Sequence, residues 1–139
     1  MAQTKVILEL SVNRIYIVDD EPDMVELLAT VLTGEGYEVE TYTDGRAALA
    51  RVLEEPPELL LLDLMMPDLD GFELLKLLRL DSRGKNVVVL IVSARTGHRA
   101  QLETLQLGAN AYIYKPFSPR ELASQVRQLL AEREGSTGE

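Results

Sequence analysis

Two uninterrupted apolar runs most constrain how this chain can fold. The first, Leu59–Leu62, follows two prolines, and the second, Val87–Val92, contains only valine, leucine and isoleucine. A strand with one face in water alternates apolar and polar residues, whereas a strand covered on both faces reads as a continuous apolar run. The two runs therefore predict central strands of a parallel sheet that has helices on both faces. Leucine is a weak strand former, so the first assignment depends on its context.

Segments with strand and helix periodicity alternate along the rest of the chain. Strands are expected at residues 14–18, 37–41, 59–62, 87–92 and 111–114. Helices are expected from Pro22 to Gly34, over 47–53, 72–80 and 99–107, and from Pro119 to about Glu132. Prolines at the first helical position and glycines after the last turn support these limits. The pattern predicts a (βα)5 fold of the α/β class in one domain.

The strand and helix pattern covers residues 14–132, which we expect to form the domain. Residues 1–13 lie outside it as an N-terminal extension, in which Val6–Leu10 either frays or adds a short edge strand. Residues 133–139 are glycine-containing and polar, so they are expected to form a flexible C-terminal tail or linker.

Composition and charge exclude several classes of function. The 139 residues include no cysteine, so neither a disulfide framework nor thiol chemistry is possible. A net charge of −9 argues against nucleic-acid binding by the surface of this domain, and it suits Mg²⁺, a basic partner or solubility alone. No run of about 18 apolar residues encodes a membrane span. The first apolar stretch ends at Glu9, too early for a signal peptide, so we expect a cytoplasmic protein.

Residues capable of chemistry stand at the ends of four predicted strands. Asp19 and Asp20 follow the first strand, Asp63 the third, Ser93 the fourth and Lys115 the fifth. Ligand sites in open α/β sheets lie beyond the carboxyl ends of the strands, so these side chains should converge. Each alone has a structural explanation: either aspartate near Pro22 would cap a helix, Asp63 would form a turn, and a lone lysine is usually a solvated charge.

The structural explanations of the single residues do not account for their predicted convergence at one edge of the sheet. Carboxylates about 5 Å apart repel by about 3 kcal/mol per pair at an effective dielectric constant of ~20, so three of them need a counter-charge. Oxygen ligands of this kind suit Mg²⁺, and a neighbouring lysine suits a phosphoryl group. The set therefore indicates a phosphoryl-transfer centre.

Four stretches carry a family resemblance: Val18–Glu21, Asp63–Gly71, Val92–Arg95 and Tyr112–Phe117. In these stretches the chain resembles the response-regulator receiver domains of bacterial two-component signalling, including chemotaxis receivers, over about residues 14–132. The resemblance implies a doubly wound, flavodoxin-like fold with a five-stranded parallel sheet in the order 2-1-3-4-5.

The resemblance also implies the chemistry of the site. Asp63 would be the phosphoacceptor and nucleophile. Asp20, Asp63 and the backbone carbonyl of Met65 would contact Mg²⁺ directly, and Asp19 would act mainly through metal-bound water. Lys115 would pair with Asp63 and then with the phosphoryl oxygens.

Two further residues would act as the switch in such a receiver. Ser93 would donate its hydroxyl to a phosphoryl oxygen, Tyr112 would turn inward behind it, and the Lys115–Pro116 bond would be cis. The phosphoryl group would come from a sensor histidine kinase or a histidine phosphotransfer protein. The response would appear on the surface of the fourth helix, fifth strand and fifth helix, and would reach an output domain or target protein. No enzymatic role is expected beyond the domain's own phosphorylation and dephosphorylation.

Three alternatives fit the residues less well. A haloacid-dehalogenase-like hydrolase needs a second acid where Met65 stands, and a nucleotide-binding domain needs a glycine-rich loop where Asp20–Pro22 stands. A receiver that serves only as an interaction module would not need the complete site.

The oligomeric state is suggested by two residues near the fifth strand. Asn110 and Ala111 replace an acidic pair that many DNA-binding receivers carry. We therefore expect a monomer that forms at most a weak dimer when phosphorylated.

Overall fold

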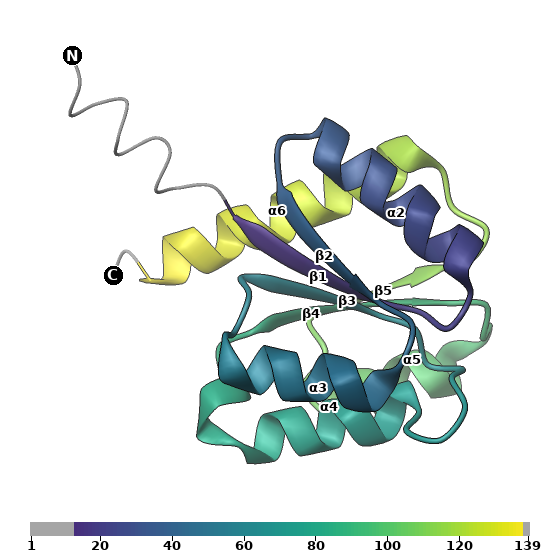
Figure 1. Ribbon diagram of the computed structural model, residues 1–139, viewed down its shortest axis with the longest axis vertical. Coiled ribbons are helices and arrows are strands. Elements are labelled where there is room, and N and C mark those ends of the chain that lie inside the picture. Colours follow the sequence, from purple (N-terminus) through teal and green to yellow (C-terminus); the bar gives the residue numbers. More distant parts are fainter. Residues whose placement is uncertain (1–12, 138–139) are drawn as a thin grey trace.

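Within residues 13–137, which the computed structural model describes, five parallel strands form the centre of the fold (Figure 1). The strands are β1 (Arg14–Val18), β2 (Glu38–Tyr42), β3 (Leu59–Leu62), β4 (Val88–Ser93) and β5 (Ala111–Tyr114). The helices are α2 (Pro22–Gly34), α3 (Gly45–Glu54), α4 (Gly71–Leu80), α5 (His98–Gln106) and α6 (Pro119–Thr137), and a 3-10 helix, η1 (Ser82–Gly84), lies between α4 and β4. The predicted alternation of strands and helices is confirmed.

The sheet has the order β2-β1-β3-β4-β5, as the resemblance implied. The chain leaves β1 in one direction to form β2 and then crosses back to form β3 on the other side, so the strand order reverses between β1 and β3. In the register of these two strands, Val18 lies opposite Leu62. The next residues, Asp19 and Asp63, therefore leave the sheet side by side, at the position where α/β folds bind ligands.

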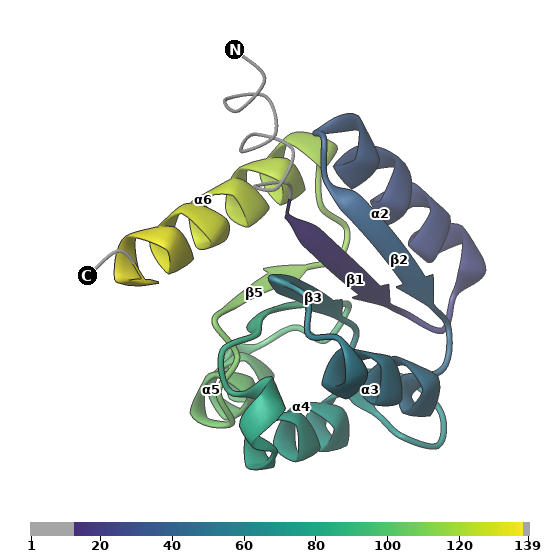
Figure 2. The same cartoon turned by 60° about the vertical axis from the view of Figure 1, so that its left-hand side comes forward.

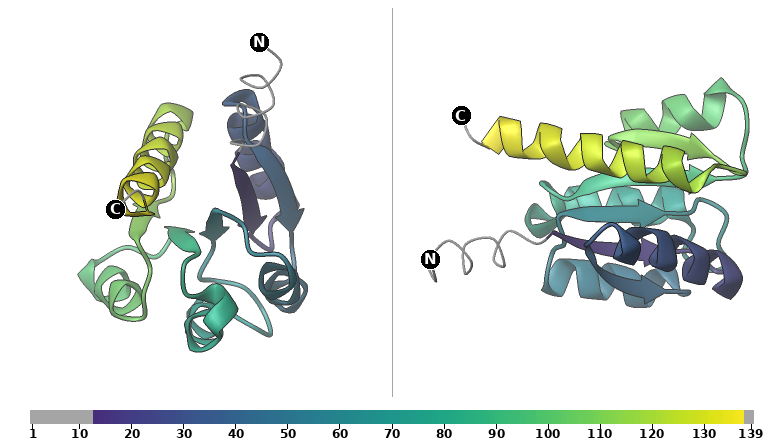
Figure 3. Two further views of the ribbon diagram at one scale, coloured as in Figure 1. Left: turned by 90° about the vertical axis from the view of Figure 1, so that its left-hand side faces the viewer. Right: turned by 90° about the horizontal axis from the view of Figure 1, so that it is seen from above.

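Helices cover both faces of the sheet. Helices α2 and α6 pack on one face, and α3, α4 and α5 lie in a row on the other (Figures 2 and 3). In β3, Leu59 and Leu61 face α2 and α6, whereas Leu60 and Leu62 face the opposite layer. All four are at most 1% exposed, which confirms that this leucine run is a strand covered on both sides. Each such side chain contributes about 1.5–3 kcal/mol by leaving water.

Some boundaries differ from those predicted. Helix α6 continues to Thr137, beyond the expected end at Glu132. Arg133 and Glu134 are good helix formers, which explains the first part of this extension. The linker role of residues 133–139 stays a prediction, and the edge strand considered at Val6–Leu10 lies outside the described residues. The helix η1 was not predicted; its first turn is held by the Asp81 side chain, which accepts a hydrogen bond from the Arg83 amide at 2.9 Å. Among residues 13–137, no helix is both long and apolar enough to cross a bilayer.

Candidate metal and phosphoryl site

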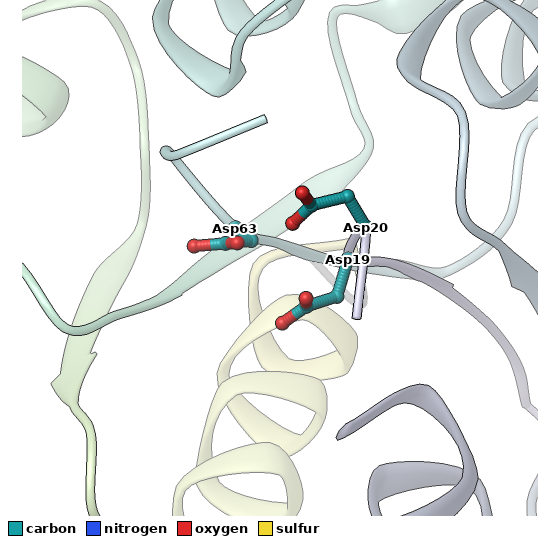
Figure 4. A group of neighbouring side chains, drawn as sticks. All are labelled: Asp19, Asp20 and Asp63. Atoms are coloured by element: carbon teal, nitrogen blue, oxygen red, sulfur yellow. The ribbon is translucent and has the colours of Figure 1, made fainter. Parts of the chain in front are cut away.

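Three carboxylates meet at the carboxyl ends of β1 and β3. One oxygen of each of Asp19, Asp20 and Asp63 lies within 4.8 Å of the others. Figure 4 shows the three side chains extending to the same side of the strand ends. Asp19 is 1% exposed and Asp63 is 4% exposed, whereas Asp20 is half-buried. The structure thus brings together the carboxylates that sequence spacing placed at these two strand ends.

A lysine directly after β5 supplies the positive charge of the cluster. The Nζ atom of Lys115 lies 2.7 Å from Oδ2 of Asp19, 3.8 Å from Oδ2 of Asp63 and 4.0 Å from Oε1 of Glu21. Its side chain is only 11% exposed, and the bond to Pro116 is cis. The direct partner of the ammonium is therefore Asp19, whereas the resemblance implied Asp63.

The environment of Asp63 disfavours its charged form. Burial, and next the neighbouring Asp19 carboxylate, raise the pKa of Asp63 to about 6, although Lys115 and the Met65 amide act in the opposite direction. The Met65 amide donates to Oδ1 of Asp63 at 3.3 Å. A divalent cation among these oxygens would favour the ionised carboxylate, because a bound ion is the largest local charge in such a site. The donor set consists of hard oxygen atoms, which fits a hard divalent cation.

Helix capping does not account for the aspartates after β1. The residue that precedes α2 is Glu21, and its side chain forms no capping hydrogen bond. Asp19 accepts a hydrogen bond from the Glu21 amide through Oδ1, at 3.0 Å, and keeps Oδ2 for Lys115. Asp19 therefore shapes the turn before α2, whereas Asp20 contributes its charge to the cluster.

The loop after β3 packs tightly against the start of α4. A Cβ atom on Gly71 would lie 2.3 Å from the carbonyl oxygen of Asp63 and 2.7 Å from Cα of Leu64, so only glycine allows this approach. Asp70 caps the helix by accepting the Glu73 amide at 2.9 Å. These contacts hold α4 directly behind Asp63.

Ser93 and Tyr112 are connected through the main chain of Arg95. Ser93 is fully buried at the end of β4, and its Oγ accepts the Arg95 amide at 3.1 Å. The hydroxyl of Tyr112 donates to the Arg95 carbonyl at 2.8 Å. Arg95 belongs to one of the four stretches that carry the family resemblance, but this link was not predicted from the sequence. The available signal was its spacing of two residues from Ser93. The Lys115 amide also donates to the Ser93 carbonyl at 2.9 Å, which joins the ends of β4 and β5.

Comparisons with known proteins agree with this geometry. The family described as the response regulator receiver domain matches residues 15–127. The DNA-binding response regulator MtrA of Mycolicibacterium smegmatis is 40% identical over 127 residues, which are 91% of this chain and 54% of the relative. The probable transcriptional regulator ycf27 of Cyanophora paradoxa is 38% identical over 130 residues, 94% of this chain and 53% of the relative. The chain thus spans about half the length of these curated relatives.

Solved structures share the fold of this chain. A CheY-like response regulator receiver domain protein from Methanospirillum hungatei superposes with a TM-score of 0.84 at 33% identity, covering 91% of this chain and 99% of that one. A putative response regulator from Chloroflexus aurantiacus gives a TM-score of 0.82 at 35% identity, with coverages of 87% and 99%. The similarity therefore extends over nearly the whole of these two structures.

Proposed function

The chain belongs to the response regulator receiver family, the phosphorylation-activated switches of two-component systems, and on that premise we propose that Asp63 accepts the phosphoryl group. The observation that carries this proposal is the position of Asp63 in the carboxylate cluster, within 3.8 Å of the Lys115 ammonium. A carboxylate oxygen of Asp63 attacks phosphorus while the bond from phosphorus to the donor histidine nitrogen breaks. The histidine nitrogen keeps the electron pair, and the product is an aspartyl phosphate.

We assign the metal site to the same cluster and its cation to Mg²⁺. Asp20 and Asp63 would provide direct oxygen ligands together with the carbonyl of Met65, and Asp19 would act through water. Bound Mg²⁺ supplies positive charge for the phosphoryl oxygens. The oxygen-only donor set, in which one oxygen of each of the three carboxylates lies within 4.8 Å of the others, supports a cation site here.

Lys115, Ser93 and Tyr112 couple the phosphoryl group to a change of shape. Lys115 needs to move only a short distance from Asp19 to meet a phosphoryl oxygen on Asp63. When the Ser93 hydroxyl turns toward the same group, its hydrogen bond from the Arg95 amide is lost. The Arg95 carbonyl then shifts relative to the Tyr112 hydroxyl, and the ring turns inward toward Ser93. The change reaches the surface formed by α5, β5 and α6.

The partners follow from the family and remain proposals for this chain. The phosphoryl donor would be a sensor histidine kinase or a histidine phosphotransfer protein in the cytoplasm. Because the matched relatives are nearly twice as long and one of them, MtrA, is named as DNA-binding, residues 14–132 would regulate an output domain or a target protein, with 133–139 as a linker. The 139-residue chain carries a net charge of −9, and the domain itself would not contact nucleic acid. Its catalysis would be limited to its own phosphorylation and dephosphorylation.

Intact-mass spectrometry tests the phosphoacceptor. Incubation with a small acyl phosphate and Mg²⁺ should add one phosphoryl group to the wild type and none to Asp63→Asn. Asp70→Asn is the matched control, because Asp70 lies in the following loop and asparagine caps a helix equally well. Equal labelling of Asp63→Asn and the wild type would overturn the assignment.

A further inference from the structure

The loop between β3 and α4 is anchored in the core on only one side. Leu64, Met66 and Leu69 are at most 8% exposed and hold the inner part of the loop. Met65 is 56% exposed, and the side chain of Asp68 is 63% exposed, so core packing does not hold the outer part. The outer part is the one that presents the backbone of Met65 near the carboxylate cluster.

Asp68 adopts a backbone conformation that needs support. Its φ angle is +67°, and it is the one non-glycine residue with positive φ within residues 13–137. Aspartate tolerates this left-handed conformation better than most residues, but the conformation persists only where surroundings maintain it. The support comes from Arg46, whose Nε lies 2.6 Å from Oδ2 of Asp68 and whose Nη2 lies 3.3 Å from Oδ1. This is a two-pronged pairing of guanidinium and carboxylate, which fixes direction as well as distance.

The position of Arg46 is not explained by the stability of its own helix. Arg46 lies in the first turn of α3, where the helix dipole disfavours a cation. That first turn also touches the loop directly, because a Cβ on Gly45 would lie only 2.6 Å from the Leu69 carbonyl oxygen. Figure 1 shows α3 beginning beside the loop that joins β3 to α4. Two consecutive residues of α3 thus face the loop, one by close backbone packing and one by an ion pair.

We infer that Arg46 is a positioning residue for the Mg²⁺ site. Through Asp68 it holds the outer part of the loop, and the loop presents the Met65 carbonyl to the metal. This inference rests on the proposed function, since it takes Met65 as a metal ligand. Asp63 fixes the start of the same loop by accepting the Met65 amide, so Arg46 and Asp63 hold the loop from opposite ends.

The direction in which one substitution changes the Mg²⁺ affinity distinguishes a positioning role from a purely electrostatic effect. Arg46→Met removes a cation from the neighbourhood of a divalent cation site, so charge alone would make Mg²⁺ bind more tightly. Loss of positioning makes Mg²⁺ bind more weakly. We expect about a two- to fivefold weaker affinity, the range that an exposed ion pair can supply. The affinity is measured by titrating Mg²⁺ against amide NMR shifts of residues 63–71.

A double-mutant cycle and a matched control complete the experiment. In the background of Asp68→Asn, which keeps a residue tolerant of positive φ, Arg46→Met should cause no further weakening. Arg83→Met removes the same two-pronged pairing from Asp81 at the far end of α4 and should not weaken Mg²⁺ binding. Urea midpoints without Mg²⁺ should be nearly equal for all variants, because the Arg46–Asp68 pair is largely exposed and the Arg83 side chain is 58% exposed.

The possible outcomes distinguish a failure of the inference alone from a failure of the proposed function on which it rests. If the wild type binds Mg²⁺ and Arg46→Met binds it equally well or more tightly, Arg46 has no positioning role, and the proposed function stands. If the wild type shows no Mg²⁺-dependent shifts at residues 63–71, the metal site itself is wrong, and the inference is overturned with it.

Discussion

Lys115 lies 2.7 Å from Asp19 but 3.8 Å from Asp63, so the ammonium pairs directly with the neighbour of the proposed phosphoacceptor. Asp63 is left with weaker compensation, although it is almost fully buried. This arrangement explains why burial and Asp19 dominate and raise the pKa of Asp63 to about 6. The fold therefore carries an electrostatic cost at the position where a phosphoryl group and a cation would meet.

Asp63→Asn should stabilise the cation-free protein at pH 7.5. The folded-state pKa of Asp63 is about 6, above the ordinary value of 3.8, so its ionisation costs stability above pH 6. The rise in pKa corresponds to at most about 3 kcal/mol, and access of water to the site reduces the expected gain to about 1–2 kcal/mol. Near pH 4 the folded-state carboxyl group is protonated and the unfolded-state group is about half ionised, so most of the gain should disappear. Urea unfolding of the wild type and Asp63→Asn at pH 4 and pH 7.5, without divalent cations, measures the gain in the free energy of unfolding. A gain that is the same at both pH values would contradict this explanation.

Lys115→Met should destabilise the protein. The substitution leaves the buried Asp19 carboxylate with the Glu21 amide as its remaining hydrogen-bond donor. Breaking one side of a largely buried ion pair should lower the free energy of unfolding by about 2–4 kcal/mol at pH 7.5. Mg²⁺ should restore part of the loss, because it binds the folded state and supplies the missing positive charge. The double variant Asp19→Asn/Lys115→Met should lose less than Lys115→Met alone, and a loss equal to the sum of the two single-variant losses would show that the pair has no net coupling.

Strand register explains why the position of the site was predictable from the sequence. Continuous apolar runs mark the central strands, and residues that follow neighbouring parallel strands leave the sheet at one edge. Val18 lies opposite Leu62, so Asp19 and Asp63 are neighbours once the pairing of these two strands is known. The strand order itself followed from the family resemblance, because periodicity does not specify which strands pair.

The pairing inside the site was not predictable in the same way. Whether Lys115 meets Asp19 or Asp63 depends on about one ångström of packing, for which no periodic pattern exists. The Arg46–Asp68 pair joins the first turn of α3 to the loop after β3, between residues 22 positions apart, so local propensity gives no signal for it. Asn110 was considered only for what it replaces, whereas its Oδ1 accepts the Val89 amide at 2.8 Å.

Asp20→Asn and Asp19→Asn should change stability in opposite directions. Asp20 adds negative charge to the cluster without capping α2, so Asp20→Asn should stabilise the cation-free protein by about 1 kcal/mol or less. Asp19 holds Lys115, so Asp19→Asn should destabilise it by about 1–3 kcal/mol. Asp20→Asn should also weaken Mg²⁺ binding about tenfold or more, as a lost ligand requires. Urea unfolding with and without Mg²⁺ gives both quantities, and a loss of stability in Asp20→Asn would revive the capping explanation.

Gly71→Ala should be severely destabilising, because its Cβ would lie 2.3 Å from the Asp63 carbonyl oxygen and backbone would have to move. We expect a loss of about 3 kcal/mol. Gly34→Ala is the control: Gly34 ends α2 with nothing within 4 Å of a new Cβ, so alanine should be neutral or stabilise by about 0.5 kcal/mol. Thermal or urea unfolding compares the two, and similar stabilities would show that the loop after β3 yields more easily than its packing indicates.

The activated protein should form at most a weak dimer. Dimers of DNA-binding receivers use charge pairs on the surface that corresponds to α5, β5 and α6, and here one basic residue of α6 already has a partner within its own chain. Arg127 already pairs with Glu35 of the same chain at 3.3 Å, and Asn110 stands where an acid is common. Surface ion pairs contribute only about 0–1 kcal/mol each, so their loss weakens and misorients contact without forbidding it. Light scattering at micromolar concentration should show a monomer without beryllofluoride, which stands in for the phosphoryl group, and at most a small dimer fraction with it.

Two exposed leucines of α5 provide apolar surface where the activated protein would dimerise. Leu102 and Leu105 are 57% and 41% exposed, and their spacing places them on one face of α5. If beryllofluoride produces a dimer, Leu102→Ala should remove it, because the apolar face would then provide what the missing charge pairs do not. Leu80→Ala is the control, since Leu80 is 77% exposed at the end of α4, outside this surface. A tight dimer that Leu102→Ala leaves intact would mean that ion pairs still dominate the surface, and that Arg127 exchanges Glu35 for a partner on the second copy.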